Sequence, residues 1–290
     1  MTSQFDLADR VFGADGRRRV LDWLDGQASY IDNADFTRSF AGRFPLPGVA
    51  VDEYSHRHVH SPRGDLLGGI RFYNRDVGRP FVEVIAHSFA TLNELRDCVR
   101  KEWASLRPGF MRLRTAPEAL IINSNTRLHK SIHIARYDDL RPHDGLVMLE
   151  PFDQLEQAIA LVERRYQTLQ CDHPDLAKIL APASPDELRE WHHGGQLYAV
   201  RVHDETVGVL AIVPSSVGWI DGDEVSEEVI VANKNGHGYA TAAQSAWAAQ
   251  IATDRDRLLI GTIHGANVAS RKTAEAVGRV RVLNDYDIAL

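Results

Sequence analysis

The sequence predicts an α+β (α/β) protein of two units, each built on a mixed, mostly antiparallel sheet flanked by helices. Two pairs of alternating apolar and polar segments, 49–73 and 197–213, are each interrupted by a polar turn and predict β-hairpins. Each hairpin is followed by a strand, a helix with apolar residues at helical spacing, and another strand. The polar, turn-rich segment 138–145 separates the two series, so we expect units at 1–142 and 143–290.

The individual elements follow from the same periodicities. In the first half we expect a helix at 17–31, strands at 49–60, 66–73, 82–86 and 110–115, and a helix at 91–106. The segment 119–137 has no clear pattern. In the second half we expect strands at 146–149, 197–202, 207–213, 258–263 and 280–290, helices at 152–169, 239–253 and 268–277, and two short helical pieces around Pro174, Pro182 and Pro185.

Composition excludes several classes of protein. A 290-residue chain with 44% hydrophobic and 25% charged residues has the make-up of a soluble globular protein. The 40 acidic residues exceed the 33 Lys and Arg, giving a net charge of -7, which argues against a general nucleic-acid or anionic-membrane binder. Cys98 and Cys171 form neither a disulfide framework nor a thiolate metal site, so a reducing cytoplasm is expected. No stretch predicts a signal peptide or membrane span.

The segment 227–245 (EEVIVANKNGHGYATAAQS) reads as a strand that runs through a glycine turn into an Ala-rich helix. Gly236 and Gly238 let backbone N–H groups turn inward without Cβ obstruction, and the helix N-terminus adds unpaired donors. An anionic ligand or a plain tight turn both fit this pattern. A dinucleotide-binding turn fits poorly, because Thr241 stands where its third glycine would be.

Two motifs in the second half together resemble the GCN5-related N-acetyltransferase (GNAT) family, and within it the ribosomal-protein N-terminal acetyltransferase branch. NKNGHGYATAAQSA is similar to the family's Q/R-x-x-G-x-G/A turn, although Asn233 replaces the usual Gln or Arg. GTIHGANVASRKTAEAVGR is similar to its later strand, Asn-x-x-Ser turn and helix. The resemblance covers about 146–290. If the first half is a degenerate second copy, its glycine-free HSFATLNEL segment implies that it has lost coenzyme A and serves as a lid, a wall or an interface.

The resemblance implies acetyl-coenzyme A as cosubstrate, with its pyrophosphate on the glycine turn and its pantetheine along the preceding strand. The residues expected to contact it are Val229, Ile230, Val231, Asn235, Gly236, His237, Gly238, Tyr239, Ala240, Asn267 and Ser270. Asn267 fits equally well as the cap of the helix that begins at residue 268.

Acetyl transfer to an amine needs a base, stabilisation of the oxyanion and a proton for the leaving thiolate. Ala274 stands where many family members have an acidic Tyr, so Ser270 is the alternative donor, or simply a helix-start residue that bonds its own backbone. Glu224, Glu227 and Glu228 precede the turn as candidate bases. Period-two alternation sends Glu227 and Glu228 to opposite faces, and we favour Glu228.

Histidines outside these motifs are weaker candidates. His192 and His193 lie in a segment expected to be a loop beside the acceptor, and His56, His58 and His60 alternate along a predicted strand. Ordinary surface polarity explains both groups better, and we expect no metal.

The expected function is an N-acetyltransferase that moves an acetyl group from acetyl-coenzyme A to a primary amine of a small molecule or peptide. One alternative is a non-catalytic coenzyme-A-binding or regulatory module. Another is an acyltransferase that uses a longer acyl-coenzyme A or an aminoacyl-tRNA, which the acidic charge disfavours. Monomer and homodimer both stay open.

Overall fold

The computed structural model describes residues 2–119 and 125–290. The chain forms two compact units: unit 1 contains residues 1–130 and 283–290, and unit 2 contains residues 131–282. Strands β5 (Thr126–Arg136) and β11 (Val280–Ala289) each contribute residues to both units. This division differs from a single cut after residue 142, because the end of the chain returns to unit 1. The assignment of an accessory and a catalytic domain stays a prediction.

Unit 1 has strands in the order β1-β2-β3-β4-β11. Its strands are β1 (Arg57–Ser61), β2 (Gly64–Phe72), β3 (Pro80–His87) and β4 (Phe110–Thr115). All neighbours are antiparallel except β3 and β4, which are parallel and joined by α4 (Leu92–Glu102). Helix α4 buries Leu95 and Val99 in a core that also holds Trp103 and Ile288, so the last strand of the chain completes this core.

Three helices precede this sheet: α1 (Thr2–Phe12), α2 (Gly16–Ala28) and α3 (Ala34–Arg43). Only α2 was expected. The predicted strand 49–60 is wrong in its first part, because residues 51–54 form a 3-10 turn and β1 starts at Arg57. Part of the unassigned segment 119–137 is β5; residues 120–124 lie outside the described chain.

Unit 2 has strands in the order β5-β10-β9-β8-β7-β6. These are β6 (Met148–Pro151), β7 (Leu197–Val202), β8 (Glu205–Val217), β9 (Ile220–Ile230) and β10 (Leu258–His264). Strands β6 to β9 pair in antiparallel fashion, and β9 and β10 are parallel. The predicted class, a mixed and mostly antiparallel sheet flanked by helices, is confirmed.

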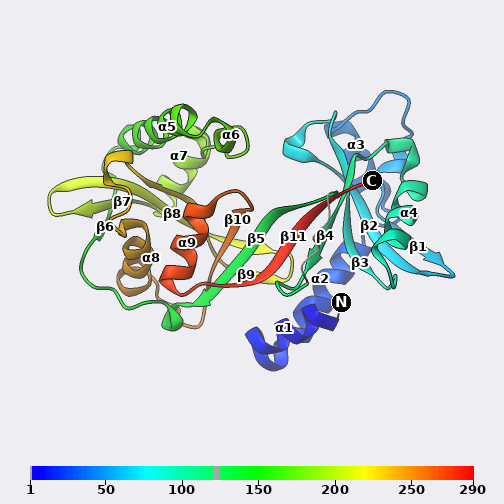
Figure 1. Ribbon diagram of the computed structural model, residues 1–290, viewed down its shortest axis with the longest axis horizontal. Coiled ribbons are helices and arrows are strands. Elements are labelled where there is room, and N and C mark those ends of the chain that lie inside the picture. The colour runs from blue at the N-terminus through cyan, green and yellow to red at the C-terminus, as the bar shows by residue number, and fades with distance from the viewer. Residues whose placement is uncertain (1, 120–124) are drawn as a thin grey trace. The chain divides into compact units, whose positions relative to one another are not determined.

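Helices cover both faces of the unit 2 sheet (Figure 1). Helices α5 (Leu155–Asp172) and α7 (Pro185–His193) pack on the face that bears Val209, Ala211 and Val229, and the short α6 (Pro174–Ala177) follows α5. Helix α8 (Tyr239–Gln250) packs on the face that bears Leu210 and Ile230, where Val277 of α9 (Val268–Val277) joins the same core. Alternation along β8 and β9 therefore decides which helices each side chain faces.

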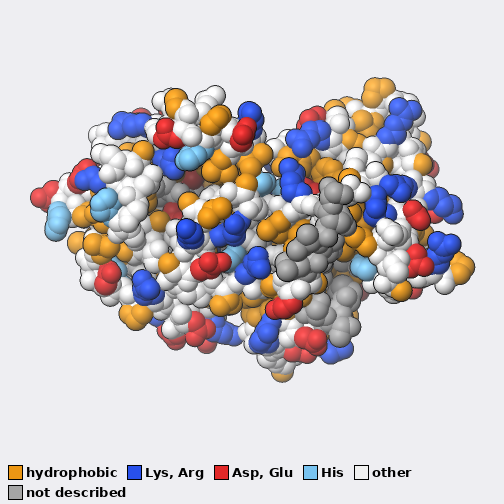
Figure 2. Space-filling model, viewed as in Figure 1, with side chains coloured by type: hydrophobic (Ala, Val, Ile, Leu, Met, Phe, Trp, Pro, Cys, Tyr) orange, Lys and Arg blue, Asp and Glu red, His pale blue; other side chains and the backbone are white. Residues whose placement is uncertain are grey.

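On the face shown in Figure 2, Lys and Arg side chains are interspersed with Asp and Glu. None of the helices in the described residues is long and apolar enough to cross a bilayer. A group of three His, Cys, Asp or Glu side chains placed to hold a metal ion is likewise absent from the described residues.

Candidate functional site

The parallel strands β9 and β10 diverge at the centre of unit 2. Within the described chain they pair only where Asp223 meets Leu259 and Glu224 meets Ile260, although both strands run on for several residues. Beyond that point, the edge of β9 has backbone groups open to a ligand. On its other side, β9 pairs Val225 with Ile212 but Glu227 with Ala211, which leaves Ser226 as the extra residue of a β-bulge.

The glycine turn follows β9 and opens α8. Gly236 and Gly238 have φ angles of 81° and 79°, which an L side chain rarely adopts. Gly238 is the N-cap of α8 and no side chain caps the helix, so its first N–H groups face outward without a side-chain acceptor. A Cβ at either glycine would meet no protein atom within 4 Å. The space in front of these donors is therefore open to an anion.

A cavity of about 760 Å³ joins the open edge of β9 to this turn. Its lining includes, from the residues expected to bind or react, Glu228, Val229, Ile230, Asn235, Gly236, Gly238, Tyr239, Ala240, Asn267 and Ser270. Among the predicted residues in the described chain, Glu227, Val231 and His237 do not line it. His237 instead stacks on Tyr239 at 5.5 Å between ring centroids.

The opposite wall of the cavity comes from α5 and the segment after it. It contains Arg165, Tyr166, Leu169, His173, Leu176 and Leu180. None of these residues was expected at a site. The helical spacing of the segment placed Tyr166 on the apolar face, and nothing in that pattern distinguishes a cavity wall from a core. The cavity is therefore lined by helices from both faces of the sheet, with α5 on one face and α8 and α9 on the other.

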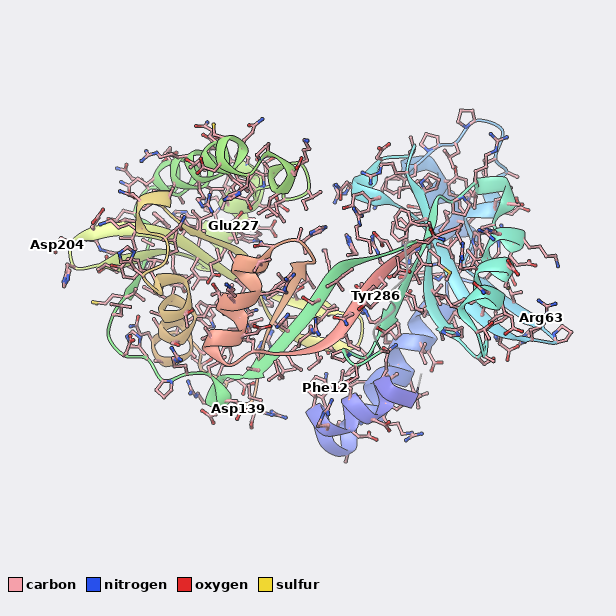
Figure 3. All side chains as sticks on the ribbon, viewed as in Figure 1. Phe12, Arg63, Asp139, Asp204, Glu227 and Tyr286 are labelled. Carbon is pink, nitrogen blue, oxygen red and sulfur yellow. The ribbon has the colours of Figure 1, made fainter. Side chains whose placement is uncertain are left out.

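Glu227 and Glu228 lie on opposite faces, as the alternation of β9 predicts. Glu227, labelled in Figure 3, faces α5 and α7 and is 6% exposed. Its carboxylate accepts hydrogen bonds from the backbone N–H of Ala183 at 2.8 Å and from the hydroxyl of Tyr166. Burial raises the pKa of Glu227, and these hydrogen bonds oppose the rise.

Glu228 is half-buried on the side of α8. Its Oε1 accepts a hydrogen bond from Nε2 of Gln244 at 2.7 Å. Burial raises the pKa of Glu228 to about 7, while Gln244 and the positive charge of Arg279 act in the opposite direction. A carboxylate with this pKa exchanges protons near neutral pH, which a general base requires.

Arg279 is a buried cation beside these acids. It is 3% exposed, and burial lowers its pKa to about 10 despite the attraction of Glu228 and Glu224. Its Nε and Nη1 have no hydrogen-bond partner among the described residues, and Nη1 lies against Gly261, where a Cβ would collide with it. Coulombic attraction to Glu228 and Glu224 is therefore what offsets its desolvation.

We expect Arg279→Met to destabilise unit 2 more at pH 8 than at pH 5. At pH 5 Glu228 is protonated in both proteins, whereas at pH 8 only the wild type has a cation to offset its charge. Because pH 8 lies about one unit above the wild-type Glu228 pKa of about 7, loss of the cation can add up to about 1.4 kcal/mol to this difference. Urea unfolding at both pH values measures it. With Glu228→Gln as the reference protein, adding Arg279→Met should cost the same stability at pH 5 and at pH 8; a cost that still depends on pH would contradict this pairing.

Glu224 occupies the position where β9 and β10 part. It accepts hydrogen bonds from Ser215 Oγ at 2.8 Å and from Thr262 Oγ1 at 3.0 Å. Because Glu224 pairs with Val213 on β8, it faces the same side of the sheet as Glu227. It is a second carboxylate near the opening, on the face away from α8.

Helix α4 of unit 1 starts differently from helix α8 of unit 2, which has no side-chain cap. In unit 1, the side chain of Thr91 accepts from Glu94 N and the Glu94 carboxylate accepts from Thr91 N, which forms a capping box on α4. The carboxylate thus occupies the place that an anion would take.

In unit 2, Asn267 caps α9 by accepting a hydrogen bond from Ser270 N at 3.2 Å, as the alternative interpretation of this residue as a helix cap predicts.

The histidine candidates do not form a site. His192 and His193 belong to the last turn of α7 rather than to a loop, and His192 Nε2 lies 2.8 Å from the carbonyl oxygen of Phe152. His56 is buried with Nδ1 at 3.0 Å from Gln27 O, whereas His58 and His60 are exposed. The three side chains therefore do not share one environment, because the strand begins only after His56.

Comparisons with known proteins give the following. No protein-family model and no curated protein matches the chain. Among solved structures, it is similar to a GNAT-family acetyltransferase from Colwellia psychrerythraea at 11% identity and a TM-score of 0.49, covering 89% of this chain and 96% of that one. It is also similar to a GCN5-related N-acetyltransferase from Kribbella flavida, at 13% identity and a TM-score of 0.43, covering 88% of this chain and 95% of that one. A GCN5-related N-acetyltransferase from Sphaerobacter thermophilus is similar at 10% identity and a TM-score of 0.43, covering 91% of this chain and 94% of that one.

Proposed function

We propose that unit 2 is an N-acetyltransferase that binds acetyl-coenzyme A and acetylates a primary amine of a small molecule or peptide. The observation that carries this proposal is one cavity that joins an open strand edge to an uncapped helix start. The uncapped helix start offers N–H donors to the pyrophosphate of coenzyme A. The open strand edge offers backbone partners to the pantetheine amides. Both lie where the sequence motifs place coenzyme A.

The residues present fit this ligand. The N–H groups at the start of α8 would hold the pyrophosphate, and the backbone of 229–231 would pair with the pantetheine amides. Lys272, exposed on α9, and Arg165 on the opposite wall supply positive charge at the cavity. Acetyl-coenzyme A would supply an activated thioester when bound. Two glycines with φ near 80° keep side chains away from the anion.

Glu228 is our candidate for the group that takes a proton from the amine. Its carboxylate lines the cavity, and its pKa near 7 keeps a large fraction of it ionised at neutral pH. The bulge at Ser226 interrupts the pairing of β9 with β8 near the opening between β9 and β10, and we propose that a backbone N–H of this segment stabilises the oxyanion. Glu224 is the alternative base, because its carboxylate lies on the other face of the same opening.

Unit 1 is proposed to have no coenzyme A site of its own. Its strand–helix–strand segment β3-α4-β4 has the same order as β9-α8-β10, with the same parallel pairing. The capping box of Thr91 and Glu94 closes the helix start that remains open in unit 2. We therefore assign unit 1 an accessory role, as a degenerate copy of the same fold.

Thermal stabilisation by coenzyme A tests the proposal. A ligand present at 100 times its dissociation constant adds about 2.7 kcal/mol to the unfolding free energy. We expect a rise in melting temperature with millimolar coenzyme A and none with pantetheine alone, which lacks the pyrophosphate. No rise with coenzyme A would contradict the proposal.

A screen of amines for release of free thiol from acetyl-coenzyme A then tests catalysis. Turnover with small amines or peptides supports the enzyme. Tight binding without turnover on any amine supports instead the non-catalytic binding or regulatory module. Ala274 and Asn233 favour that alternative, because each replaces a residue that the family motifs usually have. A preference for longer acyl donors, or strongly salt-dependent binding of an aminoacyl-tRNA, would redirect the assignment to those substrates.

A further inference from the structure

Gln244 is a buried polar side chain in the middle of α8, a helix otherwise rich in Ala. It is 0% exposed, and Ala243 and Ala246 beside it are equally buried. An amide at such a position lowers the stability of the fold unless its polar atoms are hydrogen-bonded. The hydrogen bonds of this side chain therefore indicate what it does.

The amide of Gln244 contacts the candidate base. Its Nε2 donates a hydrogen bond to Oε1 of Glu228 at 2.7 Å. Its own Oε1 is buried and has no hydrogen-bond partner among the described residues. Because an unpaired buried acceptor is destabilising, a contribution to the core does not account for the amide. The carboxylate that it holds does.

Gln244 lies behind the cavity rather than inside it. Glu228 lines the cavity, whereas Gln244 does not. Ala240 also lines it and precedes Gln244 by four residues, so Gln244 lies one helical turn deeper on the same side of α8. The start of the helix would hold the pyrophosphate, and its second turn holds Glu228. A single helix thus relates the bound cosubstrate to the carboxylate.

One oxygen of Glu228 is engaged and the other is not. Oε1 accepts from Gln244, and no described residue donates a hydrogen bond to Oε2. The bond from Nε2 restricts rotation of the carboxylate and leaves Oε2 for a proton from the cavity. It also favours the ionised form, because an N–H donor stabilises a charged carboxylate more than a neutral carboxyl group.

We propose that Gln244 is a positioning residue of the reaction: its amide holds the Glu228 carboxylate ionised and turned toward the cavity, where it accepts the proton of the amine. This inference rests on the proposed acetyltransferase function and on Glu228 as its base. Gln244 touches neither the amine nor coenzyme A, so it acts through Glu228 alone.

Gln244→Met tests the proposal because it replaces the amide with an unbranched, adaptable apolar side chain. Without the N–H donor, the pKa of Glu228 should rise above about 7. A hydrogen bond to a charged group is worth about one to two pH units, so the rise of kcat with pH should move upward by that amount. At pH 6 kcat should therefore fall about 10- to 100-fold, and the two proteins should converge at high pH.

The other charges around Glu228 are unchanged in this variant. Those that act on it are Glu227 on β9 and Arg279, which is in turn attracted by Glu224. Further charged or titratable groups line the same cavity: Arg165, Tyr166, His173, Lys234, Tyr239 and Lys272. The amine substrate titrates identically in both assays. A shift between the two pH profiles therefore belongs to the amide of Gln244.

Gln250→Met is the matched control, because it makes the same change in the same helix. Gln250 accepts a hydrogen bond from Leu149 N at 3.2 Å and does not line the cavity. Its replacement should leave the pH profile of kcat at the wild-type position. A shift of equal size in both variants would overturn the proposal, because it would then reflect helix α8 as a whole.

A second substitution keeps the size and shape of the side chain. Gln244→Glu replaces the amide NH₂ with an oxygen, and a second carboxylate disfavours the charge on Glu228. We expect the rise of kcat with pH to move upward in this variant too. A profile at the wild-type position in both Gln244→Met and Gln244→Glu would overturn the proposal.

A carboxyl ¹³C NMR titration measures the Glu228 pKa without substrate, with Glu228→Gln identifying its signal. We expect a midpoint near 7 in the wild type and one about one to two pH units higher in Gln244→Met. Adding Gln244→Met to Glu228→Gln should cost no further activity if Gln244 acts through Glu228. A purely structural role of Gln244 would instead make the two losses multiply.

The outcomes separate this inference from the function on which it rests. If the wild type turns over acetyl-coenzyme A and Gln244→Met keeps the wild-type pH profile, the inference is overturned and the function stands. The same holds if Glu224 proves to be the base, since Glu228→Gln would then keep full activity. A wild type that neither binds coenzyme A nor releases thiol with any amine overturns both.

Discussion

Gly238→Val is expected to abolish stabilisation by coenzyme A while the protein remains folded. Gly238 has a φ of 79° and caps α8, so a β-branched side chain there strains the turn and moves the N–H groups that would hold the pyrophosphate. The added side chain would also project into space that is open in the free protein. Thermal unfolding with and without coenzyme A measures the loss, which we expect to be complete at millimolar ligand.

Gly145→Val is the matched control for this substitution. Gly145 also lies in unit 2, has a φ of 77° and leaves open space at its Cβ, but it does not line the cavity. The backbone strain should be comparable at the two positions, so the melting temperature without ligand should fall similarly. Only Gly238→Val should lose the response to coenzyme A. Equal ligand responses in both variants would place the anion elsewhere.

Glu228→Gln is expected to lower kcat by 10²- to 10⁴-fold if Glu228 is the base, about the range that removal of a general base produces. The amide keeps a carbonyl oxygen for the hydrogen bond from Gln244. In the wild type, kcat should rise as pH increases through about 7, because the carboxylate must be ionised to accept the proton. That rise should be absent from the residual activity of the variant.

A stability measurement checks the Glu228 pKa without any substrate. A carboxyl whose pKa is raised by folding stabilises the native state fully below its unfolded value of 4.5, and this contribution is lost as pH rises to about 7. Glu228→Gln should therefore gain stability relative to the wild type between pH 5 and pH 7.

Glu224→Gln is the parallel variant for activity: if it abolishes turnover and Glu228→Gln does not, Glu224 is the base.

The sequence predicted best those elements whose periodicity is uninterrupted. Strands 110–115 and 197–202 and helix 268–277 have the expected bounds, because alternation or helical spacing runs to a clear stop signal at each end. Helix α3 was missed although Asn33 caps it and Phe36, Phe40 and Phe44 recur every four residues. The nearby Pro45 and Pro47 suggested a loop, but prolines after a helix do not prevent it.

The candidate site divides in the same way between local and distant contributions. The glycine turn and the opposite faces of Glu227 and Glu228 follow from backbone geometry along one segment, which a sequence displays. Tyr166 comes from a helix about sixty residues before Glu227, and Arg279, a neighbour of Glu228 in the fold, follows it by about fifty residues. Such meetings depend on tertiary packing, so helical spacing alone could not assign them.

The return of the chain to unit 1 has a consequence for how the protein is made. Residues 284–289 of β11 pair with β4, and Tyr286 and Ile288 complete the core of unit 1. During synthesis from the N-terminus, all residues of unit 2 leave the ribosome before this strand does. The first 130 residues must therefore wait, with one edge of β4 unpaired, until the whole of unit 2 has been translated. Unit 1 is therefore the first unit to be synthesised and the last to complete its fold.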